Sequence, residues 1–170
     1  MAVGVLFLRV VLGTLMAGHG AQKLFGWFGG YGLSGTGAFF EQIGFRPGRV
    51  FAAAAALGET ISGVLVALGF GGPLGPALML SVMIVAAFSV HWGHGIFAAS
   101  NGIELPLLYG AGAIALALNG PGPYSVDGWL GWTAFWTPGL AWTALVIGAV
   151  AGYANLVIRR LPTSLQHKTA

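Results

Sequence analysis

A glutamate and an arginine lie inside apolar stretches long enough to cross a bilayer. Glu59 is the single charge of residues 50–70, and Arg9 lies within residues 3–25. A charge at mid-bilayer costs about 2.5–3.5 kcal/mol on insertion scales, so it needs a partner or a function. With a helical rise of ~1.5 Å per residue, the depths of the two residues differ by roughly 7 Å, within reach of an extended arginine. We predict an Arg9–Glu59 pair, in which Glu59 either fixes helix register or serves as a proton acceptor or ligand partner beside a membrane pocket.

Five further titratable side chains are predicted to share one layer near a membrane face. They are His19, Lys23, His91, His94 and Glu104. Two facing histidines can ligate a haem, and the three histidines with Glu104 could hold a divalent metal. Histidine and carboxylate can instead hydrogen-bond a quinone and exchange protons with it, which is general acid–base chemistry. A structural alternative, in which the histidines cap helix ends and touch headgroups, stays open.

The elements that position these residues follow from the composition. Only 6% of the 170 residues are charged and 56% are hydrophobic, with a mean hydropathy of +0.84. A soluble domain carries about a quarter charged residues, so this composition predicts an integral membrane protein. A span needs roughly 20 mostly apolar residues. Five candidate spans are residues 3–25, 50–70, 74–98, 102–119 and 140–158.

The distribution of basic residues predicts an orientation. With the C-terminus inside, the cytoplasmic side receives Arg46, Arg49, Arg159, Arg160 and Lys168, with Lys23 at its edge. The outer segments, around 71–73 and 120–139, carry no lysine or arginine. The positive-inside rule therefore favours N-terminus outside and C-terminus cytoplasmic. Trp129, Trp132 and Trp136 in the outer segment are expected to form an aromatic belt, and the many glycines of residues 3–25 and 50–70 predict close helix packing.

The sequence argues against several other kinds of site and partner. The stretch "GGYGLSGTG" at residues 29–37 has the spacing of a dinucleotide fingerprint, but no strand precedes it, so no nucleotide is expected. Residues 36–48 instead predict a brief interfacial helix, with Phe39, Phe40, Ile43 and Phe45 available to the lipid boundary. The absence of cysteine from the sequence excludes disulfides, thiol redox chemistry and iron–sulfur ligation. No basic patch suggests a nucleic-acid partner.

The string "LRVVLGTLMAGHGAQKLFGWFGGYGLSGTGAFFEQIGFRPG" closely resembles the opening of the DoxX family of bacterial membrane proteins. The resemblance continues through "LGETISGVLVALG" and "VHWGHGIFAASNGIELPLLYGAGAIALALNGPGPYSVDGWL", and covers roughly residues 4–130. Its motif set comprises Arg9, Gly13, His19-Gly20-x-x-Lys23, Glu59, His91, Glu104 and the stretch from Gly120 to Asp127. The resemblance implies a four-helix bundle. It also implies a likeness to the small membrane subunit of thiosulfate:quinone oxidoreductase. The thiol chemistry of related folds does not apply, because the sequence has no cysteine.

These observations together define the expected protein. We expect an all-α membrane protein: a DoxX-like four-helix transmembrane bundle in residues 1–130, and a fifth transmembrane helix with a short cytoplasmic tail in residues 131–170. The expected function is that of a membrane subunit of an oxidoreductase complex in the bacterial plasma membrane, contacting quinone. The alternative is a non-catalytic anchor for soluble redox partners. Quinone is expected ahead of haem, and no resident metal is expected; the oligomeric state is left open.

Site residues are assigned on the same basis. Glu59 and His91 are the candidate catalytic contacts to quinone or protons. The candidate cofactor-binding residues are Arg9, His19, Lys23, Glu104 and Asp127. Asp127 lies in "PGPYSVDGW", where Pro-Gly and Asp-Gly are ordinary turn dipeptides, so it either occupies a turn or contacts a partner or substrate.

Overall fold

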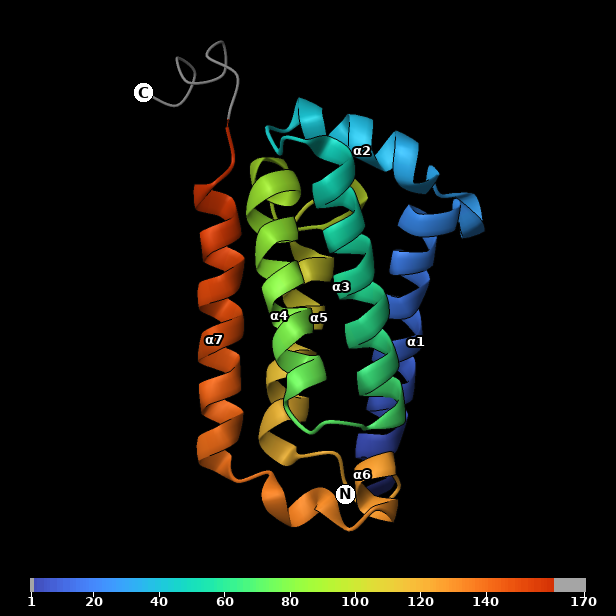
Figure 1. Ribbon diagram of the computed structural model, residues 1–170, viewed down its shortest axis with the longest axis vertical. Coiled ribbons are helices and arrows are strands. Elements are labelled where there is room, and N and C mark those ends of the chain that lie inside the picture. Colours follow the sequence, from blue (N-terminus) through green and yellow to red (C-terminus); the bar gives the residue numbers. More distant parts are fainter. Residues whose placement is uncertain (1, 161–170) are drawn as a thin grey trace.

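The chain folds into a bundle of α-helices, seen in a computed structural model that describes residues 2–160 (Figure 1). The long helices are α1 (Ala2–Phe25), α3 (Gly48–Leu68), α4 (Leu74–Ala86), α5 (Glu104–Asn119) and α7 (Pro138–Val157). Two shorter α-helices, α2 (Gly32–Gln42) and α6 (Val126–Trp129), lie at opposite ends of the bundle. Residues 2–160 contain no β-strand. The tail predicted to be cytoplasmic, with Lys168, lies outside the described residues.

The helices have the length and composition of membrane spans. Four segments are long and apolar enough to cross a bilayer: Ala2–Phe25, Gly48–Leu68, Leu74–His94 and Pro138–Val157. α5 is also apolar but has only 16 residues. The beginning of α1 and the end of α7 lie at opposite ends of the bundle, as five passes require (Figure 1). The predicted all-α membrane bundle with an additional C-terminal helix is confirmed, whereas its orientation in the membrane stays a prediction.

The third span differs from the predicted single helix over residues 74–98. α4 is α-helical only to Ala86, continues as a π-helical turn over Ala87–His91 and a 3-10 turn over Trp92–His94, and stops at Gly95, whose φ is 83°. A π-turn widens the helix by one residue and is frequent at functional sites. Here it shifts the register of the segment that carries Ser89 and His91.

Close packing of α1 against α3 depends on glycine. A Cβ added at Gly13 would lie 2.5 Å from the Ala67 nitrogen, and one at Gly63 would lie 2.4 Å from the Ala17 nitrogen. Further along, a Cβ at Gly20 would lie 2.7 Å from the carbonyl oxygen of Ala56. The backbones therefore touch directly, as glycine permits between helices in lipid. This contact fixes which residues of α1 and α3 share a level.

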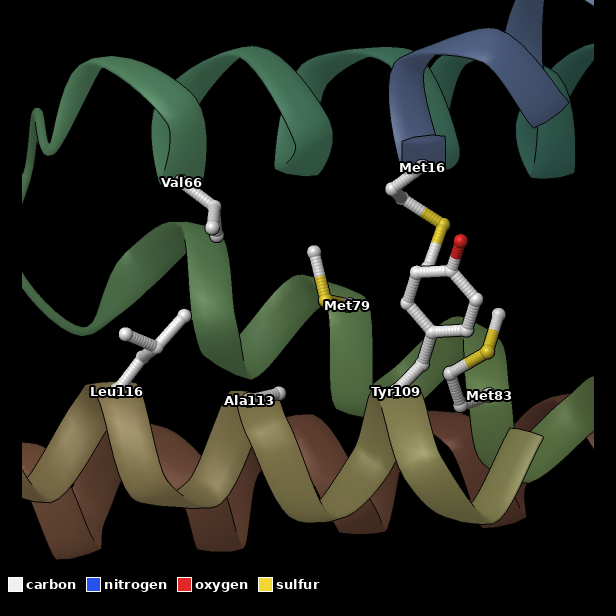
Figure 2. Close-up of a cluster of buried hydrophobic side chains, with 7 residues drawn as sticks. All are labelled: Met16, Val66, Met79, Met83, Tyr109, Ala113 and Leu116. Carbon is white, nitrogen blue, oxygen red and sulfur yellow. The ribbon is translucent and has the colours of Figure 1, made fainter. Parts of the chain in front are cut away.

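The buried apolar core lies between α1, α3, α4 and α5 (Figure 2). It contains Met16, Val66, Met79, Met83, Tyr109, Ala113 and Leu116. Unbranched methionines can fill the irregular gaps left between closely packed helices. Tyr109 is the only member with a polar group, and its hydroxyl points away from α5 toward the α1 and α3 side (Figure 2). α7 packs along α4 at the outer side of this bundle.

The short helix α2 lies across the ends of α1 and α3 and packs mainly on α3 (Figure 1). It begins earlier than predicted, at Gly32. The prediction that Phe45 faces the lipid boundary is wrong, because its side chain is 1% exposed and packs on Phe40 and Phe51. The segment that follows α7 covers this turn, because the Arg160 amide donates to the Gly44 carbonyl at 2.8 Å. Phe39 remains exposed, as predicted.

Candidate functional site

The buried carboxylate of α3 is paired with a lysine of α1. The Lys23 ammonium donates to Glu59 Oε1 at 2.8 Å and to Oε2 at 2.7 Å. The Glu59 side chain is 6% exposed and that of Lys23 is 26% exposed. The predicted Arg9–Glu59 pair is therefore wrong. The glycine contacts set Gly20 level with Ala56, so Lys23 is the cation of α1 that reaches Glu59.

Arg9 belongs to the opposite end of the bundle. Its guanidinium donates to the carbonyl oxygens of Tyr124 and Ala67, and it packs against the backbone of Gly69. Its side chain is buried and its Nε has no partner in the described part of the chain. Carbonyl partners at the end of α3 give Arg9 a structural role, because they tie α1 to the α3–α4 turn and to the segment before α6.

Asp127, a candidate ligand contact from the sequence, is completely buried. Its carboxylate accepts hydrogen bonds from the Gly71 amide at 3.1 Å, the Gly72 amide at 2.7 Å and Trp136 Nε1 at 2.7 Å. These three donors give both carboxylate oxygens a partner within the protein and hold the α3–α4 turn. Trp136 is thus turned inward, whereas Trp129, which was also predicted for the aromatic belt, is 84% exposed.

A cavity of about 830 Å³ lies beneath α2, bounded by residues of α1, α2, α3, α4 and α5. Its polar walls include Lys23, Glu59, His19, Gln22, His91 and Tyr109. Its apolar walls include Phe39, Phe51, Leu78, Val82 and Val85. Ligand sites are commonly concave, mostly apolar and equipped with a few polar groups that fix orientation, and this cavity has that character. Four of the candidate site residues therefore meet at one cavity.

Both cavity histidines have one ring nitrogen occupied. His19 Nδ1 lies 3.2 Å from Gln22 Oε1, and the Gln22 amide group donates to the Phe28 carbonyl at 3.2 Å. His91 Nδ1 lies 2.7 Å from the Asn101 carbonyl oxygen. His19 also packs edge-to-face on the Tyr109 ring, with 5.9 Å between centroids. Both imidazoles are therefore oriented by neighbouring groups.

Two members of the predicted layer do not line this cavity. His94 is exposed, and its Nδ1 bonds the Val90 carbonyl at 3.0 Å. Glu104 accepts a hydrogen bond from the Ala98 amide at 2.7 Å and so holds the loop between α4 and α5. No group of three His, Asp or Glu side chains suited to a metal ion occurs in residues 2–160. Of the five residues predicted for one layer, His19, Lys23 and His91 therefore line this cavity.

Sequence reasoning missed Gln22 and Tyr109 as cavity residues. Gln22 is one position before Lys23, but a glutamine near a helix end gives no signal of its own. Tyr109 is the only polar side chain among residues 105–118 and could have been noticed as a hydroxyl in a span. Gly30 also bears on the site, because a Cβ there would lie 2.3 Å from the Gln22 carbonyl oxygen.

Comparison with known families identifies the fold. The DoxX family model matches residues 4–92, which is more than half of the chain. The chain belongs to the DoxX family. The matched region of this DoxX protein contains Lys23, Glu59, His19 and His91, whereas Tyr109 and Asp127 lie beyond it. No curated protein and no solved structure matches the chain.

Proposed function

We propose that this DoxX protein is the membrane subunit of an oxidoreductase complex and that it contacts a quinone in the cavity beneath α2. One observation carries the proposal: the Lys23–Glu59 pair lies in the wall of a largely apolar cavity of about 830 Å³. A structural ion pair within a helix bundle needs no cavity beside it. Ionisable groups inside a membrane protein more often mark a substrate or proton pathway when they border such a space.

The residues present fit a quinone. The Lys23 ammonium has three donors and gives two of them to Glu59, which leaves one for a ring carbonyl. The Tyr109 hydroxyl is a second possible donor in the same cavity. Phe39, Phe51 and other apolar walls suit the ring and the start of an isoprenoid tail. When bound, a quinone supplies two-electron chemistry coupled to two protons.

The protein's own groups would bind and hold protons. Glu59, His19 and His91 are the groups in the cavity that can accept a proton, and Lys23 donates to both oxygens of the Glu59 carboxylate. Phe39 of α2 and Phe51 of α3 supply apolar walls beside these groups. In this proposal the redox partner that donates or receives electrons is another subunit of the complex, soluble or membrane-bound.

We also propose the bacterial plasma membrane as the location, with the cavity toward the cytoplasmic side. Arg46 and Arg49 lie between α2 and the first turn of α3, and Arg159 follows α7 at the same end of the bundle (Figure 1). Clustered basic residues at one end favour the cytoplasmic face. The N-terminus would then be outside, and lipid would contact the exposed apolar faces of the helices.

The proposal is tested on protein purified in mild detergent, by a visible spectrum and by solvent extraction with mass spectrometry. We expect stoichiometric quinone that is depleted in Glu59→Gln and in His91→Ala. His94→Ala is the matched control. Like His91, His94 bonds a backbone carbonyl through Nδ1, but it lies outside the cavity. A haem band in the spectrum would replace the quinone assignment with a haem site.

A folded, colourless and quinone-free protein would overturn the proposal. It would support the alternative function, a non-catalytic anchor that gathers soluble redox proteins at the membrane. An anchor is expected to retain those partners regardless of Glu59→Gln, which separates the two functions.

A further inference from the structure

The hydrogen bond of His91 places a hydrogen on one ring nitrogen and so assigns the tautomer of the neutral ring. A backbone carbonyl oxygen can only accept, so the Nδ1 that lies 2.7 Å from the Asn101 oxygen must carry the hydrogen. In the neutral ring the other nitrogen, Nε2, then has a lone pair and no hydrogen. The neutral His91 ring therefore accepts a hydrogen bond at Nε2 and does not donate one there.

The same assignment holds for His19, by way of Gln22. The Gln22 amide nitrogen donates to the Phe28 carbonyl, which fixes the direction of the amide and leaves Oε1 toward His19. Because Oε1 only accepts, His19 Nδ1 carries the hydrogen and Nε2 carries the lone pair. Two residues of the α1 end thus set the tautomer of a histidine in the cavity wall.

The polar wall of the cavity therefore includes acceptors as well as donors. Both His19 and His91 line it, and the hydrogen bonds of both rings within residues 2–160 are made by Nδ1, which leaves Nε2 for a ligand. Two imidazole acceptors thus stand beside two donors, the Lys23 ammonium and the Tyr109 hydroxyl. A ligand that satisfies all four must donate and accept at its polar ends.

We propose that the cavity binds the reduced, hydroxyl-bearing form of its quinone in preference to the oxidised form; the inference rests on the proposed function. A quinol hydroxyl donates to an imidazole Nε2 and still accepts from Lys23 or Tyr109. A quinone carbonyl only accepts, so it leaves the Nε2 acceptors of His19 and His91 facing an oxygen or unpaired. A ligand carbonyl set against these acceptors displaces water from them without replacing its hydrogen bond, and an acceptor left unpaired in this way costs free energy.

Binding of both redox forms to the full-length protein in lipid nanodiscs tests this inference. A short-chain quinone and its quinol, kept reduced under anaerobic conditions, are titrated by calorimetry. We expect the quinol to bind with a Kd roughly tenfold lower, the effect of about one hydrogen bond retained. By linkage, a tenfold difference raises the midpoint potential of the bound two-electron couple by about 30 mV, which an independent redox titration measures.

Variants of the groups that fix the tautomers separate a change in the preference for quinol from a change in affinity for both redox forms. Gln22→Leu removes the acceptor for His19 Nδ1 and is expected to reduce the preference for quinol. His91→Gln places an amide that can donate or accept, so it too is expected to reduce the preference. His94→Gln, outside the cavity, is expected to leave both Kd values unchanged.

The outcomes are distinct. Equal binding of the two forms, tighter binding of the quinone, or an unchanged preference in both Gln22→Leu and His91→Gln would overturn the inference and leave the quinone site standing. If neither form binds, the proposed function fails, and the inference fails with it.

Discussion

Replacing Lys23 is expected to lower the free energy of unfolding more than replacing Glu59 does. Lys23→Met leaves a carboxylate that is 6% exposed with no donor for either oxygen. Removing one partner of a buried pair costs about 3–5 kcal/mol, and this substitution should fall in that range. Glu59→Gln leaves an ammonium that is 26% exposed and can still donate to the amide oxygen, so about 1–3 kcal/mol is expected.

The double replacement decides whether the two residues act as a pair. Lys23→Met with Glu59→Leu removes both charges and keeps apolar volume, which in buried pairs is often neutral or stabilising by about 1–4 kcal/mol. We therefore expect the double variant to be more stable than Lys23→Met alone, with a coupling free energy of at least about 2 kcal/mol.

Reversible unfolding in mixed detergent micelles, followed by far-ultraviolet circular dichroism, measures the cycle of wild type, Lys23→Met, Glu59→Leu and the double variant, with Glu59→Gln measured beside it. Arg46→Met is the matched control, because Arg46 is an exposed basic residue near α2, and its effect is expected to stay within about 0.5 kcal/mol. Additive losses, with the double variant less stable than either single variant, would refute the view that the pair is buried and mutually dependent.

Three further predictions concern packing, the opposite end of the bundle and orientation. Gly63→Val pushes a side chain into the α1 backbone and should cost at least about 1–3 kcal/mol in the same unfolding assay, whereas Gly18→Ala, with open space around it, should not destabilise. Asp127→Ala leaves three donors unpaired and should lower the thermal midpoint of unfolding far more than Trp129→Phe, whose ring is exposed. A single cysteine at Thr133, in a chain that has none, should react with an impermeant maleimide in intact cells; labelling only after lysis would reverse the proposed orientation.

The sequence predicted the helices better than their register. Composition and apolar runs locate the spans, because a long stretch without charges crosses the hydrocarbon core as a helix. The pairing of Glu59 was wrong because depths were counted separately along each helix. The level of one helix against another is set by backbone contacts such as Gly13 with Ala67 and Gly63 with Ala17, which no single-helix count contains.

The site was predicted in part, for a related reason. Lys23, Glu59, His19 and His91 lie in spans whose faces converge, so their types and approximate depths were enough to select them. His94 and Glu104 do not line the cavity, because His94 bonds the Val90 carbonyl and Glu104 accepts from the Ala98 amide in the loop after α4. The tautomer of His91 depends on the carbonyl of Asn101, which reaches the ring through the geometry of the loop between α4 and α5. A local sequence pattern does not encode that geometry.

The two ends of the bundle illustrate how a buried polar group can be assigned to structure or to function. At one end, Asp127 has three donors from the protein itself, and all of them hold a turn in place. At the other end, Lys23, His19 and His91 each retain a donor or acceptor after their protein partners are counted, and each lines the same cavity. Unused hydrogen-bonding capacity is costly in an apolar environment unless a ligand or water satisfies it. Arg9 Nε also lacks a partner in the described part of the chain, but Arg9 does not line this cavity. Unused donors and acceptors that gather around one cavity, rather than burial or charge alone, make the cavity beneath α2 the place to look for a ligand.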